Sequence, residues 1–551
     1  MLETPLKNKY LCNAGLPDIN QELLEMTSSS RSTSQLRLAA IDLGTNSFHM
    51  IIVELLPDMS FTMIDRAKEM IRIGAGSMMT KQLSAAAMAQ GLDTLMRFRK
   101  LAEQRGVDVQ HIVAFATSAI REAKNGEQFM EMIASRVGIR TRIISGEEEG
   151  RLIYLAIRRA INIGKRKALM IDVGGGSVEF MIGDAQNLYF VESKKLGVAR
   201  LLERFVTTDP ISDRELSALE GHLVEEIRPI AKAVKAIGYD FAIASSGTAE
   251  NIAAMILLAE RGQDFEALNG SCFLRRGFLK LYEKLLAIPS EERRQIAGLD
   301  PQRAELIVPG MVLFDVMMRL FDLKEMTISE YALREGIVLD YLSRHFAPIS
   351  FAKEDESPRL RSVLELARRC QWDEVRSRHI ANLSLQLFDQ LEALHELGKV
   401  ERELLQYAAY LHNIGYFISP SAHHKHSQYI IQNAGLKGFS PEEIQIMANV
   451  ARYHRKSPPK VEHTAFQSLS PRNKHVVRVL AGLLRLANAL DRGHRQNVKS
   501  VKAIIHPKKI ELRLTAISDP EIEIWAATQM SDMFEAVFSR KLVLSVEQNA
   551  D

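Results

Sequence analysis

The sequence predicts an α/β fold made of two similar halves, followed by a mainly helical domain and a small α+β tail. The duplication is predicted by two matching segments, LAAIDLGTNSFHMIIV at 38–53 and ALMIDVGGGSVEFMI at 168–182. Each is an apolar strand, an Asp, a Gly-rich turn with hydroxyl groups and a second apolar strand, which is the pattern of a β-hairpin. Alternating strands and helices follow both hairpins. An internal duplication is therefore favoured over two unrelated α/β domains in series.

The order of elements is similar in the two halves, 36–165 and 166–345. In the first half we expect strands at 37–43, 47–56 and 60–73, a helix at 82–104, a strand at 111–117 with a helix from Ser118, and a strand at 140–146 with a helix at 147–162. In the second half we expect strands at 168–173, 177–183 and 187–193, helices near 197–205 and 211–237, and a strand at 241–247 followed by a helix at 248–259.

The remaining segments differ in composition. Residues 1–35 are polar and read as a flexible leader, and 347–360, with prolines and acidic residues, reads as a linker. Residues 358–495 are mostly helical and rich in histidine. The alternating pattern in 496–551 predicts a small β-containing module.

Composition excludes several classes of protein. A net charge of +3 gives no overall signal for binding a long polyanion, so we expect no DNA partner and only local anion sites. Three cysteines without a pattern argue against a disulfide framework and for a reducing compartment. The most apolar helical stretch, 476–490, is too short for a membrane span, and the N-terminus does not have the pattern of a signal peptide. We expect a cytoplasmic protein, with peripheral membrane association left open.

The two Gly-rich turns have the chemistry of phosphate-binding loops, because bare backbone N–H groups and small hydroxyl groups suit phosphate oxygens. The candidate phosphate-binding residues are Gly44, Thr45, Asn46 and Ser47 in the first loop and Gly174, Gly175, Gly176 and Ser177 in the second. Asp42 and Asp172 end the strands before these loops and are candidate ligands for a divalent cation. The alternative for either Asp is a residue that caps its own turn.

Five segments in this order resemble the exopolyphosphatase / guanosine pentaphosphate phosphohydrolase family. They are IDLGTNSFHM, ATSAIREAKNG, IISGEEEGRLI, IDVGGGSVEF and SSGTAENIA. The resemblance covers roughly 36–345 strongly. It implies the duplicated actin-like and sugar-kinase-like (ribonuclease H-like) fold, and in the long members a C-terminal helical domain related to HD metal phosphohydrolases.

The resemblance also implies roles for single residues. Glu149 in SGEEEGR is the expected general base, Arg121 the expected phosphate clamp, and Glu179 a helper to the metal or the attacking water. Asp172 is the stronger of the two metal candidates, and Mg²⁺ or another divalent cation is the expected cofactor. Gly247 and Thr248 open a helix whose N-terminus suits a further phosphate.

The same residues also have ordinary structural interpretations. A capping box at Ser145 accounts for Glu147 and Glu148 but does not need Glu149. Arg121 alone would read as a surface arginine, and the chain departs from the family by having Gly150 where Ala is common.

The helical domain contains an incomplete HD motif. The HD resemblance implies His379, the pair His412-Asn413 and Asp491 as its metal ligands, and Asn413 replaces the acidic member of the pair. Because an amide lacks the charge that anchors a hard cation, we expect this domain to be catalytically inactive. Basic and imidazole groups in HHKH (423–426) and YHRK (453–456) suggest a track for an anionic chain. Further candidates for this track are Lys456, Lys460, Arg485, Arg492 and Arg495.

The leading expectation is a magnesium-dependent exopolyphosphatase that releases terminal orthophosphate from inorganic polyphosphate. The near alternative is removal of the 5′ γ-phosphate of guanosine pentaphosphate. More remote alternatives are an actin-like ATPase or sugar kinase, and a non-catalytic sensor. A homodimer is expected from the family resemblance only.

Overall fold

The computed structural model describes residues 36–56, 61–261, 268–345 and 357–546. The chain divides into two compact units, Met1–Asp355 and Glu356–Asp551. The expected leader and most of the expected linker lie outside the described residues. No helix within the described ranges is long and apolar enough to cross a membrane.

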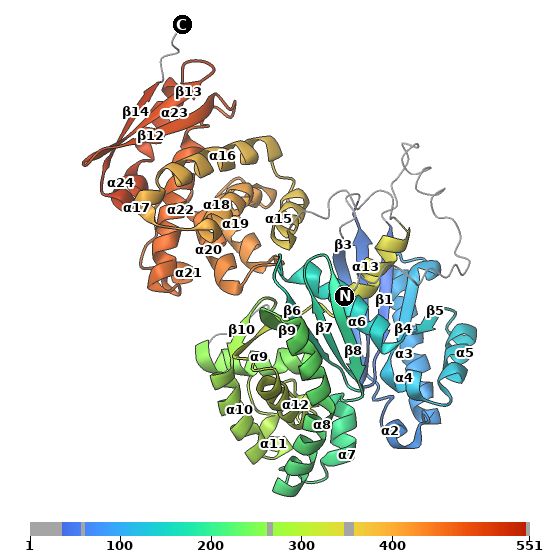
Figure 1. The fold of residues 1–551 in the computed structure, drawn as a ribbon. Coiled ribbons are helices and arrows are strands. Elements are labelled where there is room, and N and C mark those ends of the chain that lie inside the picture. Colours follow the sequence, from blue (N-terminus) through green and yellow to red (C-terminus); the bar gives the residue numbers. More distant parts are fainter. Residues whose placement is uncertain (1–35, 57–60, 262–267, 346–356, 547–551) are drawn as a thin grey trace, which may run out of the picture. The chain divides into compact units, whose positions relative to one another are not determined.

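The first half of unit 1 is a five-stranded sheet in the order β3-β2-β1-β4-β5 (Figure 1). Its strands are β1 (Arg37–Leu43), β2 (Ser47–Leu55), β3 (Phe61–Met70), β4 (Ile112–Ala116) and β5 (Arg140–Ile143). Strand β1 is antiparallel to β2 and parallel to β4. The helical elements are α2 (Ser77–Thr80), α3 (Ala85–Gln104), η1 (Val109–His111), α4 (Ser118–Glu122), α5 (Gly126–Arg136) and α6 (Gly146–Ala160).

The second half repeats this topology in a sheet of order β10-β11-β9-β6-β7-β8. Its strands are β6 (Ala168–Val173), β7 (Val178–Gly183), β8 (Leu188–Lys194), β9 (Phe241–Ser245), β10 (Cys272–Leu274) and β11 (Glu325–Ser329). Its helical elements are α7 (Val198–Phe205), α8 (Asp213–Ile237), α9 (Ser246–Arg261), α10 (Arg275–Ala287), α11 (Ser290–Arg293), η2 (Pro301–Arg303), α12 (Ile307–Leu320) and α13 (Leu333–His345). Strands β8-β7-β6-β9-β11 correspond to β3-β2-β1-β4-β5, so the predicted duplication is confirmed.

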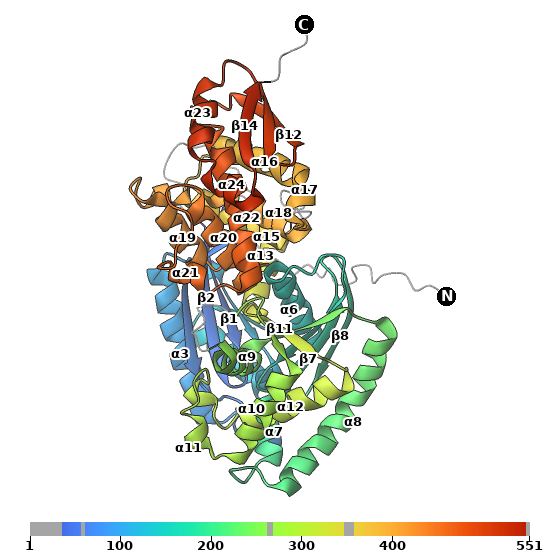
Figure 2. The same cartoon turned by 90° about the vertical axis from the view of Figure 1, so that its left-hand side faces the viewer.

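The alternation of buried residues along β1 explains how the first sheet is covered on both faces. Ala39 and Ile41 point into a core formed with α3 and α5, whereas Leu38 and Ala40 point into a second core. This second core also contains Leu152 of α6, residues of α13, and residues of β6 and β7 from the other sheet. Helices α6 and α13 therefore form a layer that both sheets share. Figure 2 shows α3 beside the first sheet and α8 at the periphery of the second half.

The strand–Asp–Gly pattern that the two halves share lies at corresponding places, the carboxyl ends of their parallel strands. Asp42 at the end of β1 pairs in register with Phe115 of β4, and Asp172 at the end of β6 pairs with Ser245 of β9. The Gly-rich loops and the starts of α4 and α9 therefore lie at these strand ends, which is where open α/β sheets bind ligands.

Unit 2 is mainly helical and ends in a three-stranded sheet of order β12-β13-β14. Its helical elements are α15 (Pro358–Arg369), α16 (Glu374–Gln390), α17 (Glu392–His395), α18 (Lys399–Leu411), η4 (Ile414–Phe417), α19 (His423–Asn433), α20 (Pro441–Tyr453), α21 (Thr464–Gln467), α22 (Pro471–Ala489), α23 (Glu521–Gln529) and α24 (Asp532–Phe538). Its strands are β12 (Val498–Ile505), β13 (Lys509–Ala516) and β14 (Lys541–Val546). Val498, Ile510 and Leu512 of the sheet belong to the same hydrophobic core as the helices.

Candidate active site

In the first Gly-rich loop, between β1 and β2, two carbonyl groups accept hydrogen bonds from the segment that follows β3. The N–H of Arg72 donates to Asn46 O at 2.8 Å, and the N–H of Gly74 donates to Thr45 O at 3.0 Å. In a planar trans peptide the carbonyl and the N–H point in opposite directions. The N–H groups of Asn46 and Ser47 therefore point away from the segment that binds the carbonyls.

The second loop, between β6 and β7, is held in the same way by α7. Backbone N–H groups at the start of α7 donate to Gly174 O at 3.0 Å and to Gly175 O at 2.9 Å. The Arg200 side chain donates from Nε to Gly176 O at 3.0 Å. The N–H groups of Gly175, Gly176 and Ser177 consequently point to the opposite side, where they form a set of donors suited to an anion.

The two loops approach each other so closely that side chains would not fit between them. A Cβ at Gly176 would lie 2.6 Å from Thr45 Oγ1 and 2.6 Å from Ser118 Oγ, at the start of α4. A Cβ at Gly175 would lie 3.2 Å from the Thr45 Cβ. The structure therefore brings the predicted phosphate-binding residues of both loops together, and close approach explains the glycines of the second loop.

Four acidic side chains lie near these loops, namely Asp42, Glu149, Asp172 and Glu179. Asp42 is paired across the β1–β2 ladder with His49, and Asp172 is paired across the β6–β7 ladder with Glu179. Glu179 is 1% exposed, so it is not a solvent-facing strand residue. Its Oε1 accepts a hydrogen bond from Ser193 Oγ at 2.8 Å. Asp172 Oδ1 accepts a hydrogen bond from Ser245 Oγ.

The pKa values of these carboxyl groups are all raised. Burial, followed by the charge of Glu149, raises the pKa of Asp42 to about 8. Burial raises the pKa of Glu149 to about 7, although Arg121 opposes the shift. Burial raises the pKa of Asp172 to about 6, and burial with the charges of Glu149 and Asp172 raises the pKa of Glu179 well above its usual range. A nearby cation would favour the ionised forms of these acids and so would offset the rise in their pKa values.

The arrangement of these acids fits a hydrated divalent cation. Asp42 Oδ1 and Glu179 Oε2 are buried and have no hydrogen-bond partner among the described residues. No three His, Cys, Asp or Glu side chains in the described part of the chain are placed so that they could hold an ion together. Magnesium commonly takes only one or two carboxylates and keeps several waters. Asp172 and Asp42 therefore stay the candidate ligands, and Glu179 Oε2 is a further unpaired acceptor among the buried acids.

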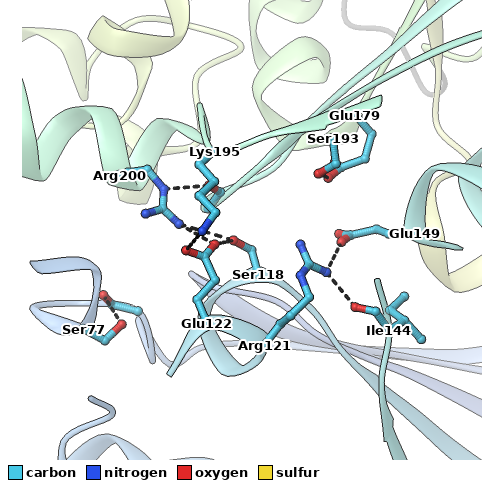
Figure 3. Close-up of polar contacts among 12 residues, drawn as sticks. Ser77, Ser118, Arg121, Glu122, Ile144, Glu149, Glu179, Ser193, Lys195 and Arg200 are labelled. Carbon is cyan, nitrogen blue, oxygen red and sulfur yellow. Dashed lines mark hydrogen bonds and ion pairs between the residues drawn. The ribbon is translucent and has the colours of Figure 1, made fainter. Parts of the chain in front are cut away.

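Glu149 and Arg121 come from separate elements and meet in a direct ion pair. Arg121, on α4, donates from Nη1 to Glu149 Oε2 at 3.0 Å and to the carbonyl of Ile144 at 2.8 Å (Figure 3). Glu149 lies in the first turn of α6 and is 7% exposed. Arg121 is thus not a surface arginine paired along its own helix.

The start of α6 is fixed by its cap and by close packing against β8. The Ser145 side chain accepts from the N–H of Glu148 at 3.1 Å, whereas the Glu148 carboxylate pairs with Arg142 at 2.6 Å. Only one of the two hydrogen bonds of the expected capping box is therefore present. A Cβ at Gly150 would lie 2.6 Å from Val191 Cγ2, so close helix–strand contact explains the departure from alanine.

Arg334 and His49 were missed by the sequence reasoning. Arg334, in α13, donates from Nη1 to His49 Nδ1 at 2.9 Å, and His49 Nε2 lies 2.7 Å from Ser47 Oγ. Since arginine can only donate, Nδ1 accepts and Nε2–H donates to Ser47, which leaves the Ser47 O–H to donate elsewhere. Burial and Arg334 lower the pKa of His49 well below its usual range, in agreement with a neutral ring. His49 lies two residues after Ser47 on β2, so the sequence could have indicated that the two side chains share one face of the strand. No local sequence signal indicates Arg334.

The start of α9 lies at the end of β9, as expected. Arg303 and helix α12 pack against it. A Cβ at Gly247 would collide with the guanidinium of Arg303, which therefore covers this N-terminus. Thr248 is buried, and a Cβ at Gly310 of α12 would lie 2.7 Å from its methyl group. An anion at Gly247 would therefore meet Arg303 as well as the helix N-terminus.

In unit 2 Arg376 pairs with Asp491, the acid among the predicted HD-like metal ligands. Arg376 donates from Nε to Asp491 Oδ2 at 3.1 Å and from Nη2 to Asn488 Oδ1 at 3.1 Å. Both members of this ion pair are buried. His379 Nε2 and His412 Nε2 are buried without a hydrogen-bond partner in the described residues. The charge that would attract a metal is therefore neutralised by Arg376, in addition to the replacement at Asn413.

The suggested anion track in unit 2 is only partly exposed. His423 and His424 are buried, and the His423 ring stacks on Tyr416 with centroids 4.0 Å apart. Arg485 is buried and paired with Asp532 at 3.2 Å, so it does not line a surface track. His454 is buried as well, whereas Lys456, Lys460, Arg492 and Arg495 are exposed.

The fold and the opposed loops define a protein with duplicated actin-like domains. The profile of the Ppx/GppA phosphatase family matches residues 51–345, and the profile of domain III of the Ppx/GppA phosphatases matches residues 359–522. The chain belongs to the Ppx/GppA phosphatase family.

Individual relatives agree with this assignment. A guanosine-5′-triphosphate,3′-diphosphate pyrophosphatase from Vibrio vulnificus (strain YJ016) is 29% identical over 418 residues, covering 76% of this chain and 80% of the relative. The crystal structure of an exopolyphosphatase from Cytophaga hutchinsonii is 29% identical, with a TM-score of 0.53 over 56% of this chain and 98% of that chain. The structure of an exopolyphosphatase-like protein is 26% identical, with a TM-score of 0.51 over 56% of this chain and 99% of that chain.

Proposed function

We propose that this chain is a magnesium-dependent exopolyphosphatase that releases terminal orthophosphate from inorganic polyphosphate. The observation that carries the proposal is the position of Glu149. This buried glutamate pairs with Arg121 at 3.0 Å and lies close enough to Asp42 and Glu179 to affect their ionisation. Phosphoanhydride hydrolysis needs a water activated in line with the leaving group and donors for the charge on the transferring phosphoryl group.

In the proposed reaction, ionised Glu149 accepts a proton from a water whose oxygen attacks the terminal phosphorus. The bond from that phosphorus to the bridging oxygen breaks, and its electron pair stays on the bridging oxygen of the shortened chain. Arg121 and the N–H groups of the two loops donate hydrogen bonds to the phosphoryl oxygens. A pKa of about 7 suits Glu149 to proton transfer near neutral pH.

Magnesium would be held by Asp172 and Asp42, and it would neutralise charge on the phosphate oxygens. Glu179, whose Oε2 is unpaired, would orient a water bound to the cation. The Ser47 hydroxyl, fixed as a donor by His49, would bind a non-bridging oxygen.

A polymer is the favoured substrate because cationic side chains also lie beside the first loop, apart from its N–H donors. A cavity of about 300 Å³ is lined by two arginines and one glutamate, Arg72, Arg294 and Glu305, together with Pro301, Gln302 and Ala304. The N–H of Arg72 donates to the loop carbonyl of Asn46, so this cavity borders the first loop on the side away from its N–H donors. The solved relative from Cytophaga hutchinsonii is itself named an exopolyphosphatase.

Guanosine pentaphosphate is the second candidate substrate. The relative from Vibrio vulnificus carries the name of an enzyme acting on the guanosine compound, and it covers more of this chain than the solved structures do. The same loops, acids and Glu149 would serve both substrates, because the bond cleaved is a terminal phosphoanhydride in each.

The test is release of orthophosphate from long-chain polyphosphate, guanosine pentaphosphate and ATP, each with Mg²⁺. The proposal predicts that polyphosphate is shortened from its ends with the highest kcat/KM. Preference for guanosine pentaphosphate would support the second candidate. Preference for ATP would indicate an ATPase, and cleavage of none of them would favour a non-catalytic sensor.

A further inference from the structure

An ion pair between Arg200 and Glu122 joins the two halves of unit 1 beside the phosphate loops. Arg200, on α7 of the second half, lies with Nη2 2.8 Å from Oε1 of Glu122, on α4 of the first half (Figure 3). The Arg200 side chain is 16% exposed and that of Glu122 is 23% exposed. Ser118 also donates to Glu122 Oε1, at 2.9 Å. Glu122 directly follows Arg121 in the chain, so this contact adjoins the proposed catalytic pair.

The same guanidinium fixes the second phosphate loop. Its Nε donates to Gly176 O at 3.0 Å, while Nη2 reaches Glu122. The orientation of this carbonyl decides where the N–H of Ser177 points, because the two belong to one planar peptide. The carbonyls of Gly174 and Gly175 are held by backbone N–H groups, whereas that of Gly176 accepts from this side chain.

We propose that Arg200 is a positioning residue for the second phosphate loop, and that Glu122 makes this positioning depend on contact between the two halves. Glu122 holds the planar guanidinium, and the guanidinium holds the Gly176–Ser177 peptide with its N–H toward the phosphate site. If the halves move apart, Arg200 loses its acidic partner, and the guanidinium restrains the peptide less firmly. This inference rests on the proposed function only in taking the loop as a phosphate site.

Lys195 provides a matched control. Its Nζ lies 2.9 Å from Oε2 of the same Glu122, and its side chain is 70% exposed. It has no contact with the Gly176 carbonyl among the hydrogen bonds of the described residues. Lys195→Met therefore removes one positive charge next to Glu122 without removing the restraint on the loop.

The experiment measures binding of inorganic phosphate by calorimetry in the presence of Mg²⁺, together with KM and kcat for polyphosphate, in the full chain. Arg200→Met should weaken phosphate binding and raise KM by about tenfold, the change expected from losing a charge-assisted hydrogen bond, with kcat changed less than KM. Arg200→Lys should be intermediate, since an ammonium group lacks the planar fork. Lys195→Met should change neither quantity by more than about twofold, as for an exposed ion pair.

The coupling to Glu122 is tested by a double-mutant cycle. Glu122→Gln should weaken phosphate binding in the wild-type background and have little further effect in Arg200→Met. Additive effects, equal effects of Lys195→Met and Arg200→Met, or a fall in kcat with phosphate affinity unchanged would overturn the proposal. So would wild-type protein that binds no phosphate. Should Arg200→Met not fold, Arg200→Lys and Glu122→Gln decide the question. Wild type that binds phosphate but cleaves no substrate would refute the proposed function alone.

Discussion

Arg121 Nη1 lies 3.0 Å from Glu149 Oε2 and, at 2.8 Å, also donates to the carbonyl of Ile144 just before the α6 cap. One nitrogen thus ties α4 to the start of α6 and holds the proposed base against a cation. Burial raises the pKa of Glu149 to about 7, and Arg121 limits that rise. The reactivity of Glu149 should therefore depend on Arg121.

Replacing Arg121 should move the pH dependence of hydrolysis. A general base acts when ionised, so activity rises with pH through the pKa of Glu149. Arg121→Met removes the group that opposes the raised pKa, so the acidic limb of the kcat/KM profile should shift to higher pH. The loss of a phosphate donor should also lower kcat/KM by about 10²-fold or more. Arg142→Met, which removes the exposed partner of Glu148, is the control. An acidic limb that stays in place or moves to lower pH would contradict this role.

Magnesium should stabilise the protein more at pH 8 than at pH 6. The folded-state pKa values of Asp42, Glu149, Asp172 and Glu179 are all raised. A raised pKa contributes stability that is complete below the ordinary range of about 4 and is lost as pH rises through the folded value. The metal-free protein should therefore lose stability between about pH 4 and pH 8, and a cation bound by the ionised acids should restore it.

The measurement is the Tm of unit 1 with and without Mg²⁺ across this pH range. Asp172→Asn should reduce the magnesium effect at pH 8. Asp93→Asn, which changes an exposed acid of α3, should leave it unchanged. A magnesium effect that is independent of pH, or that survives in Asp172→Asn and Asp42→Asn alike, would exclude these acids as the binding site.

Alanine at position 150 should destabilise unit 1 unless Val191 is also reduced in size. The added Cβ would meet Val191 Cγ2 at 2.6 Å, and overpacking of this kind costs about 1–3 kcal/mol. Gly150→Ala should therefore lower Tm and displace Glu149, which precedes it. The double variant Gly150→Ala/Val191→Ala should recover much of the activity. If Gly150→Ala alone is fully active and stable, close packing is not the reason for the glycine.

Repetition and local chemistry made much of unit 1 predictable from the sequence. The two hairpins appear in the sequence as matched strand–Asp–Gly segments, and the structure gives both halves the same strand order. The position of Glu149 in the first helical turn followed from the Ser145 cap, whereas the second capping hydrogen bond was replaced by the Glu148–Arg142 pair. That pair depends on a side chain from a neighbouring strand, which capping patterns do not include.

Contacts between distant segments account for what was missed. Arg334 reaches His49 across 285 positions of sequence, and Arg200 reaches Glu122 across 78. Neither arginine lies in a pattern with its partner, so only the folded arrangement shows them. Burial likewise decided that Arg485 belongs to the interior of unit 2, although its charge had suggested a surface role.

Breaking the buried ion pair of unit 2 should destabilise that unit without restoring metal binding. Arg376→Met leaves Asp491 buried without its cation, and such losses cost about 3–5 kcal/mol. Arg376→Met/Asp491→Leu should recover part of this loss, because both charges are then removed. The measurement is the Tm of the unit 2 transition in the full chain, and Arg378→Met, which breaks an exposed pair with Glu374, is the control.

Restoring the acidic member of the His412-Asn413 pair should not restore metal binding in unit 2. The variant Asn413→Asp should bind no stoichiometric metal ion in unit 2, because Asp491 is still paired with Arg376. Metal analysis of Asn413→Asp in an Asp42→Asn/Asp172→Asn background isolates unit 2 from the proposed magnesium site. One equivalent of bound metal in that variant would show that Arg376 does not block the site.

The most direct test of the account is orthophosphate release from long-chain polyphosphate and guanosine pentaphosphate by wild type, Glu149→Gln and Glu147→Gln, with Mg²⁺ at saturating substrate. Glu147 is exposed in the same helical turn, so its variant controls for the loss of one charge. Glu149→Gln should fold, bind inorganic phosphate and lose about 10²–10⁴-fold in kcat, whereas Glu147→Gln should retain nearly full activity. A folded Glu149→Gln protein with undiminished kcat on the substrate that wild type cleaves would contradict the assignment of the base.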